Sequence, residues 1–289
     1  MLPEFDLLRP QTLPEALALL ADNDPAVMPL AGGTNLIVEL RDGQRSPRKL
    51  VDVGRLHELR GIRRDDGHVV VGGATTIAEL LAHPLIAEHG RPLRQAAALL
   101  GNPLVRSRAT IGGNLANASP AADTAPPLMA LGAEVELVSR NGTRRLPLHD
   151  FMVDVNATLI RPDELVAAVR WPVPPANCAA GFYKIGLRKA DACSVINAAA
   201  MVVCDHGGLC RQARIAIGAA APRPVRAHRA EAVLEGRLLD SRTIEEAARL
   251  AVEATQPIDD IRGSAAYRRR MAEVIVRRLL TQAAEAQAQ

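Results

Sequence analysis

The chain has 289 residues, 48% of them hydrophobic, and a formal net charge of +3. This length and apolar content are sufficient for one large domain or two ordinary ones, each with a proper core. The small net charge, the spread of basic residues and an aromatic content of only 2% argue against a nucleic-acid-binding surface.

The N-terminal sequence, the apolar runs and the cysteine spacings argue against several other classes of protein. The N-terminal sequence "MLPEFDLLRPQT" has no basic and then apolar leader, so we expect no signal peptide. No apolar run is long enough to cross a bilayer, and we expect a cytoplasmic protein without a membrane span. The cysteine spacings match neither a metal site nor a disulfide framework and favour buried reduced thiols, at Cys178, Cys193, Cys204 and Cys210.

The first elements alternate between helix and strand. Residues 12–22 predict a helix with Thr12 as its N-cap. Residues 26–43, "AVMPLAGGTNLIVELRDG", predict a short strand, a glycine turn and a helix from near Thr34. A further strand is expected at "KLVDVGR", residues 49–55.

The same pattern returns in "HVVVGGATTIAELLAHP", residues 68–84, which predicts strand, glycine pair and capped helix. An apolar run followed by two glycines and a threonine or asparagine thus occurs three times, at 30–35, 69–76 and 110–114. Residues 133–151 follow and predict a hairpin, because an Asn-Gly pair separates two alternating segments.

The second half predicts a separate group of strands and helices. A strand at 163–174 ends in prolines, and a domain boundary is expected near Pro174 to Cys178. Residues 181–227 predict two or three strands with a turn at a glycine pair, Gly207-Gly208. Helices are expected at 228–238, at 241–255 and after Ser264. Because strands occur in blocks, the pattern favours an α+β fold over a doubly wound α/β sheet.

The glycine turns are candidates for holding a diphosphate. Backbone N–H groups at a bend into a helix supply donors and a favourable dipole when no Cβ blocks the approach. "PLAGGTNL" at 29–36 has this form, and "TIGGN" at 110–114 would converge with it on one extended ligand. The alternative is that both are only tight turns, which is the favoured interpretation of "VGGATT" at 71–76. GxGxxG and the P-loop are absent.

Two charged residues are weaker candidates. Asp123 is either a turn-former or an acceptor for ribose or ring N–H groups. Lys184, in the aromatic sequence "GFYK", is either a solvated strand residue or a ligand-binding cation. The sequence contains no HExxH, GxSxG or metal-spaced Cys and His set, so no catalytic or metal-ligating residue is predicted. A solvated or subunit-facing helix side is expected for the arginines at 268–270, 277 and 278.

Four segments together resemble the FAD-binding medium subunit of molybdenum hydroxylases, the family of xanthine dehydrogenase and carbon monoxide dehydrogenase flavoproteins. They are 29–36, 106–135, 182–200 and 261–271, in the same order and spacing. The resemblance implies a two-lobed FAD-binding domain of the vanillyl-alcohol-oxidase (PCMH) type over 1–175, with lobes of about 1–55 and 56–175. A smaller sheet-plus-helices domain, of the carbon monoxide dehydrogenase flavoprotein C-terminal type, would cover 178–285.

The resemblance also implies the cofactor contacts. The first bend would wrap the FAD diphosphate, the second would lie at the diphosphate and flavin ring, and Asp123 and Lys184 would be a polar contact and a cation near the flavin. Asn35 departs from the Asp, Glu or Ser of many relatives. The implied FAD-binding residues are Pro29, Leu30, Ala31, Gly32, Gly33, Thr34, Asn35, Leu36, Leu100, Thr110, Ile111, Gly112, Gly113, Asn114, Ser119, Asp123, Val166 and Lys184.

By the same resemblance the chain would be an electron-transfer subunit. Electrons would arrive from [2Fe–2S] clusters in a small partner subunit, a large partner subunit would hold the molybdopterin, and NAD, a quinone or oxygen would accept the electrons. A dimer of heterotrimers is implied. The alternatives are a self-contained FAD-dependent oxidoreductase and a non-catalytic nucleotide-binding assembly module.

Overall fold

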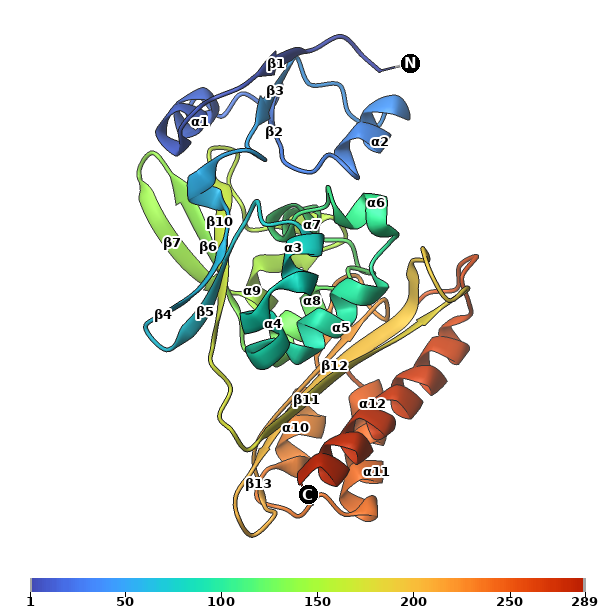
Figure 1. Ribbon diagram of the computed structural model, residues 1–289. Coiled ribbons are helices and arrows are strands. Elements are labelled where there is room, and N and C mark those ends of the chain that lie inside the picture. Colours follow the sequence, from blue (N-terminus) through green and yellow to red (C-terminus); the bar gives the residue numbers. More distant parts are fainter. Residues whose placement is uncertain (1, 288–289) are drawn as a thin grey trace.

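The computed structural model describes residues 2–287, whose strands form four sheets with helices between and around them (Figure 1). Strands cluster along the chain instead of alternating regularly with helices, and most strand pairs are antiparallel. The expected α+β class is therefore confirmed. The limits 1–55, 56–175 and 178–285 stay predictions.

The N-terminal unit is a small parallel sheet in the order β1-β3-β2, with one helix packed on it. The predicted cap is present, because the Thr12 hydroxyl accepts the Glu15 N–H. The second helix begins at Leu36, two residues after the predicted Thr34. The elements are β1 (Asp6–Leu8), α1 (Leu13–Leu20), β2 (Val27–Leu30), α2 (Leu36–Arg41) and β3 (Lys49–Asp52).

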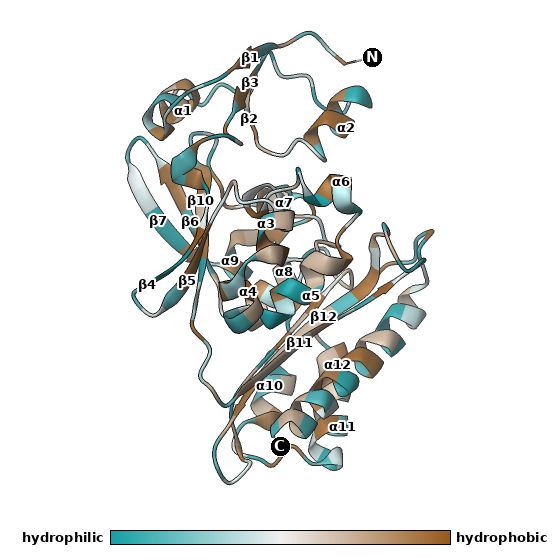
Figure 2. Cartoon of the chain, viewed as in Figure 1, coloured by the Kyte–Doolittle hydropathy of each residue, from teal (hydrophilic) through white to brown (hydrophobic). Residues whose placement is uncertain are grey.

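The central unit is an antiparallel sheet in the order β4-β5-β10-β6-β7, which packs on a group of short helices. The edge strands β4 and β7 are largely hydrophilic, whereas β5 and β10 between them are apolar (Figure 2). The predicted hairpin is confirmed at β6 and β7. The strands are β4 (Ile62–Asp65), β5 (His68–Gly72), β6 (Glu134–Ser139), β7 (Gly142–Pro147) and β10 (Leu165–Pro172); β8 (Met152–Asp154) and β9 (Ala157–Thr158) form a separate pair.

The helices of the central unit lie between β5 and β10 in the sequence and cover one face of their sheet (Figure 1). Most are only one or two turns long, and several begin with a proline in the first turn. They are α3 (Ile77–Ala82), α4 (Pro84–His89), α5 (Arg91–Leu99), α6 (Pro103–Arg106), α7 (Ile111–Asn117), α8 (Ala125–Ala130) and α9 (Leu148–Phe151), with the 3-10 turn η1 (His57–Leu59) before β4.

The third glycine motif differs from the predicted pattern of strand and turn. Thr110 makes only an isolated bridge to Thr76, and Gly112 and Gly113 lie in the first turn of α7. The Thr110 hydroxyl accepts the Gly113 N–H and caps this helix. A threonine before a helical turn is a preferred N-cap, and here that preference outweighs the low helix propensity of two glycines.

The C-terminal unit is an antiparallel sheet in the order β11-β12-β13-β14. Its own helices cover one face, and α5 and α8 of the central unit cover the other. This explains why β12 is buried along almost its whole length and is rich in alanine. The elements are β11 (Cys178–Gly186), β12 (Ser194–Cys204), β13 (Cys210–Gly218), β14 (Val225–Arg226), α10 (His228–Leu234), α11 (Ser241–Val252) and α12 (Ala265–Gln287).

Two further expectations concern the state of the cysteines and the presence of a membrane span. All four cysteines are free; Cys204 and Cys210 are buried as expected, but Cys193 is exposed. Burial raises the pKa of the Cys210 thiol to about 12, so it is a poor nucleophile. No helix between residues 2 and 287 is both long enough and apolar enough to cross a membrane.

The packing of Gly73 against β10 gives a prediction about stability. A Cβ at Gly73 would lie 1.9 Å from the carbonyl oxygen of Val166, in backbone that has little room to move. We expect Gly73→Ala to lower the free energy of unfolding by about 3 kcal/mol, measured by urea denaturation. Gly207→Ala, whose Cβ would approach only the Asp205 carboxylate at 3.3 Å, is the control and should cost less than about 1 kcal/mol. Equal losses would contradict this account.

Candidate functional site

A cleft of about 600 Å³ separates the N-terminal unit from the central unit. Its walls are the bend 29–36, the start of α7 and the segment 156–166 that leads into β10. This volume is typical of a site for a small molecule or cofactor. Two of the three glycine motifs, far apart in the sequence, therefore border one cavity, and the third contributes Gly73 to its wall.

The first bend supplies free hydrogen-bond donors to the cleft. A Cβ at Gly32 would lie 1.9 Å from the Arg108 carbonyl oxygen, so only glycine lets the bend lie against the segment that enters α7. Gly33 has a φ of +74°, a conformation that favours glycine. Within residues 2–287, the N–H groups of Gly32, Gly33 and Thr34 donate to no protein acceptor. Such a run of free N–H groups is suited to an anion.

The second bend, residues 110–114, differs from the first because its main-chain N–H groups already donate to acceptors of the protein. The Ile111 N–H donates to the Thr75 carbonyl at 3.0 Å, and the Gly112 N–H donates to the Gly73 carbonyl at 2.8 Å. The Gly113 N–H donates to the Thr110 hydroxyl at 3.1 Å. Only the first bend therefore keeps main-chain amides free for a ligand. Helix α7 instead contributes two features to the cleft wall: main chain without a side chain at the exposed Gly113, and the side chain of Asn114.

The middle glycine motif is structural, as predicted, but it also shapes the cleft. Gly73 fits between Val166 and Gly112, since a Cβ on Gly112 would lie 2.7 Å from the Gly73 carbonyl oxygen. Val166, predicted from the family resemblance, lies in the cleft wall beside it. The three motifs therefore meet. Gly32 of the first motif packs against the segment that enters α7, and Gly73 of the middle motif packs against Gly112 of α7 itself.

The wall of the cleft includes Glu164, whose ion pair with Arg144 the sequence did not reveal. The guanidinium group of Arg144 donates two hydrogen bonds to the Glu164 carboxylate, at 2.6 and 2.8 Å. Burial acts to raise the pKa of Glu164, but the hydrogen bonds from Arg144 and from the Arg161 N–H outweigh it and lower that pKa. No local motif marks Glu164, which lines the cleft together with Asn117, Asn156, Thr158 and Pro162.

Asp123 and Lys184 form a buried ion pair at a second position. The Lys184 ammonium donates to the Asp123 carboxylate at 2.5 Å and to the Leu99 carbonyl at 3.1 Å. Ser194 and Asn197 donate to the other carboxylate oxygen of Asp123, at 2.6 and 3.0 Å. Both charged side chains are less than a tenth exposed. Burial of a matched pair requires such hydrogen bonds to compensate for lost hydration.

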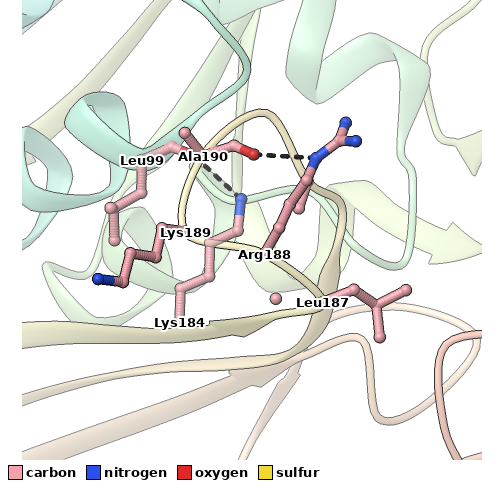
Figure 3. Close-up of a pocket in the computed structure, with 8 residues that line it drawn as sticks. Leu99, Lys184, Leu187, Arg188, Lys189 and Ala190 are labelled. Carbon is pink, nitrogen blue, oxygen red and sulfur yellow. Dashed lines mark hydrogen bonds between the residues drawn. The ribbon is translucent and has the colours of Figure 1, made fainter.

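Lys184 of this pair lines a smaller cavity of about 380 Å³ at the loop between β11 and β12. Figure 3 shows Lys184 reaching toward Leu99, with Arg188 and Lys189 of the loop nearby. A hydrogen bond links this region to the wall of the larger cleft. The hydroxyl of Thr124, next to Asp123, donates to the side chain of Asn114 at 2.5 Å, and Asn114 lines that cleft.

The structure thus sorts the predicted site residues into groups. Residues 29–36, Thr110, Gly112–Asn114 and Val166 line the large cleft. Lys184 lines the small one, with Asp123 as its partner. Ile111 and Leu100 are buried in the core, and the Ser119 hydroxyl accepts the Ala121 N–H at 3.3 Å. That these residues contact a cofactor stays a prediction.

Two family models match the chain. The FAD binding domain in molybdopterin dehydrogenase matches residues 3–174, and the CO dehydrogenase flavoprotein C-terminal domain matches residues 181–283. The carbon monoxide dehydrogenase medium chain of Afipia carboxidovorans is 36% identical over 98% of both chains. A putative xanthine dehydrogenase FAD-binding subunit of Escherichia coli is 32% identical, over 96% of this chain and 95% of the relative.

Solved structures agree with these matches. The Cu,Mo-CO dehydrogenase in its cyanide-inactivated form superposes with a TM-score of 0.94 at 35% identity, covering 99% of this chain and 100% of the other. Quinoline 2-oxidoreductase from Pseudomonas putida 86 gives 0.92 at 33% identity, with 99% of each chain covered. The chain belongs to the family of FAD-binding medium subunits of molybdenum hydroxylases. The predicted family, the two-domain PCMH-type fold, the FAD cofactor and the oxidoreductase class are confirmed.

The lowered pKa of Glu164 leads to a prediction about pH. A carboxylate whose folded-state pKa is depressed stabilises the protein above its ordinary pKa of 4.5, and this contribution is lost as the pH falls through the folded-state value. We expect Glu164→Gln to lower the free energy of unfolding by about 2 kcal/mol at pH 7. The difference from wild type should shrink below pH 4.5 in urea titrations at each pH.

The control for this pH prediction is Glu136→Gln on the same sheet, where the carboxylate pairs with the half-exposed Arg145 at 2.7 Å. An exposed pair contributes at most about 1 kcal/mol, so this variant should differ little from wild type. A Glu164 effect that stays constant down to pH 3 would contradict the assignment.

Proposed function

We propose that this chain carries FAD as the electron-transfer subunit of a multi-subunit molybdenum hydroxylase. It takes electrons from [2Fe–2S] clusters of a small partner subunit and delivers them to NAD, a quinone or oxygen. One observation carries the proposal: a cleft with three free main-chain donors lies in a chain that covers 98% of a carbon monoxide dehydrogenase medium chain.

The residues present fit FAD. The free N–H groups of the first bend bind the diphosphate, and the bare surface at Gly113 lets the cofactor lie against α7. Val166 would supply an apolar neighbour, and the family resemblance would place the Asp123–Lys184 pair near the flavin. Flavin supplies chemistry that side chains lack, because it takes up electrons singly and releases them in pairs. The protein holds and orients it.

The remaining cofactors belong to partners in this proposal. Residues 2–287 contain no group of three or more His, Cys, Asp or Glu side chains placed to hold a metal ion. An iron–sulfur small subunit and a large subunit with the molybdenum cofactor complete the enzyme, as a dimer of heterotrimers in the cytoplasm. The flavin-binding part covers about 1–175, and a C-terminal domain covers 178–285.

Two other functions give different experimental results. A self-contained FAD-dependent oxidoreductase would reduce its flavin with its own substrate, without partner chains. A non-catalytic nucleotide-binding assembly module would carry no redox-active flavin. The described part of the cleft presents Glu164 as its buried carboxylate, and this group is tied to Arg144 and Arg161. It is therefore poorly placed to act as a free acid or base.

Purification from the native source tests the assembly. We expect the chain to elute with two other polypeptides, and with flavin, iron and molybdenum at constant ratios across a size-exclusion peak. Mass spectrometry identifies the chains, and metal analysis measures the iron and molybdenum. A yellow protein that elutes alone and is reduced by a substrate would favour the self-contained oxidoreductase. A colourless chain that takes up no FAD would reject both flavin functions.

A substitution at Gly113 tests the placement of FAD. A valine there projects from the exposed first turn of α7 into the cleft, while helix propensity rises relative to glycine. We expect Gly113→Val to weaken FAD binding at least about tenfold, equivalent to about 1.4 kcal/mol, in a fluorescence titration. Because a Cβ at Gly113 would lie 2.8 Å from the Thr110 hydroxyl that caps α7, the melting temperature of the cofactor-free chain should fall as well. Gly113→Ala adds the same Cβ without the further methyl groups and is the matched control for this loss of stability. Gly207→Val, in the turn between β12 and β13, is the control and should bind FAD normally.

A further inference from the structure

The start of α12 carries a cluster of charged side chains that the cofactor cleft does not use. Asp260 accepts hydrogen bonds from the Arg262 guanidinium at 2.6 Å and from the Arg268 guanidinium at 2.5 Å. These guanidinium groups hold the pKa of Asp260 far below its usual range, the Arg262 hydrogen bond having the largest effect. Arg268 is only 2% exposed, so the expectation of a solvated or subunit-facing side is wrong for this arginine.

Each arginine also holds the end of a strand. The Arg262 guanidinium donates to the carbonyl of Ser194, the first residue of β12, at 3.3 Å. The Arg268 guanidinium donates to the carbonyl of Ala219, directly after β13, at 3.4 Å. Ala219 has a φ of +59°, which is uncommon for a residue with a Cβ and needs support from its surroundings.

Both strand ends contact the loop that carries Asp123. The Ser194 hydroxyl donates to the Asp123 carboxylate at 2.6 Å. The Ala219 N–H donates to the Pro120 carbonyl at 2.7 Å. A circuit of hydrogen bonds therefore runs from Asp260 through the two arginines to two strand ends, and from there to Asp123 and to Pro120 in the same loop.

The circuit ends at the Lys184 ammonium. Asp123 has one carboxylate oxygen toward Ser194 and the other toward Lys184, so any rotation that loses the first bond also disturbs the second. Lys184 uses two donors on Asp123 and Leu99, and an ammonium group has three. The position of its third donor thus depends on how firmly Asp123 is held.

We propose that Asp260, Arg262 and Arg268 are positioning residues that fix the Asp123–Lys184 pair toward the cofactor. The cofactor half of this statement rests on the proposed function. The other half, that the cluster immobilises the pair, is a property of the cofactor-free chain. The two halves are therefore tested by separate measurements.

The chain contains only three lysines, at 49, 184 and 189, which makes the pair directly observable. Lys49 and Lys189 are exposed, whereas the Lys184 side chain is 6% exposed. The full cofactor-free chain is treated with acetic anhydride, and the acetylation rate of each lysine is followed by peptide mass spectrometry. We expect Arg262→Gln to raise the ratio of Lys184 to Lys189 labelling by about tenfold.

The control is Arg237→Gln, which removes an exposed ion pair to Glu246 at 3.1 Å in the same domain. It should leave the labelling ratio unchanged, and Arg262→Lys should restore most of the protection. If Arg262→Gln does not fold, Ser194→Ala cuts the same circuit with a small change in volume and should raise the ratio in the same way. A ratio equal to wild type in either folded variant overturns the proposal.

FAD titration of the same variants tests the cofactor half. We expect Arg262→Gln to weaken FAD binding several-fold in the wild-type background and less than about twofold in an Asp123→Asn background. An equal effect in both backgrounds would show that the cluster does not act through Asp123 and would overturn the proposal. If the wild-type chain bound no FAD, the proposed function would fail, while the lysine ratios would still decide whether the cluster fixes the pair.

Discussion

The close approach of main chains at three glycines is the constraint on which the site depends. Gly32 lies against the Arg108 carbonyl, Gly73 against the Val166 carbonyl, and Gly112 against Gly73. A Cβ added at any of the three would lie between 1.9 and 2.7 Å from the facing carbonyl oxygen, so only glycine permits these contacts. Together they hold the N-terminal unit, β10 and α7 close enough to enclose one cavity, which is lined by the first bend with its free N–H groups.

The sequence located this site but could not assign the hydrogen bonds within it. Glycine pairs beside threonine or asparagine identify where backbone comes close to something else, and both outer motifs do border the cleft. Whether that neighbour is a ligand or the protein depends on distant residues. The Ile111 and Gly112 amides pair with Thr75 and Gly73, more than thirty positions earlier, and no local pattern reveals such partners.

Local signals predicted most of the strands and the longer helices, because alternation, caps and an Asn-Gly turn act over short distances. The helices between residues 84 and 106 were not predicted, since segments of one or two turns form only through tertiary packing. Arg268 was misassigned for a related reason. Its neighbours Arg269 and Arg270 are exposed, whereas the Asp260 carboxylate and the Ala219 carbonyl make burial of the first arginine favourable.

The Asp123–Lys184 pair spans two parts of the chain that each have their own sheet. Asp123 precedes α8 in the central unit, and Lys184 lies on β11 of the C-terminal sheet, which is also clamped between α8 and α12. If either part were produced without the other, one member of the pair would lose its counterion, and the apolar face between α5, α8 and the C-terminal sheet would be exposed to water. A gene fragment that encodes only the first part would therefore carry an apolar flank that favours aggregation.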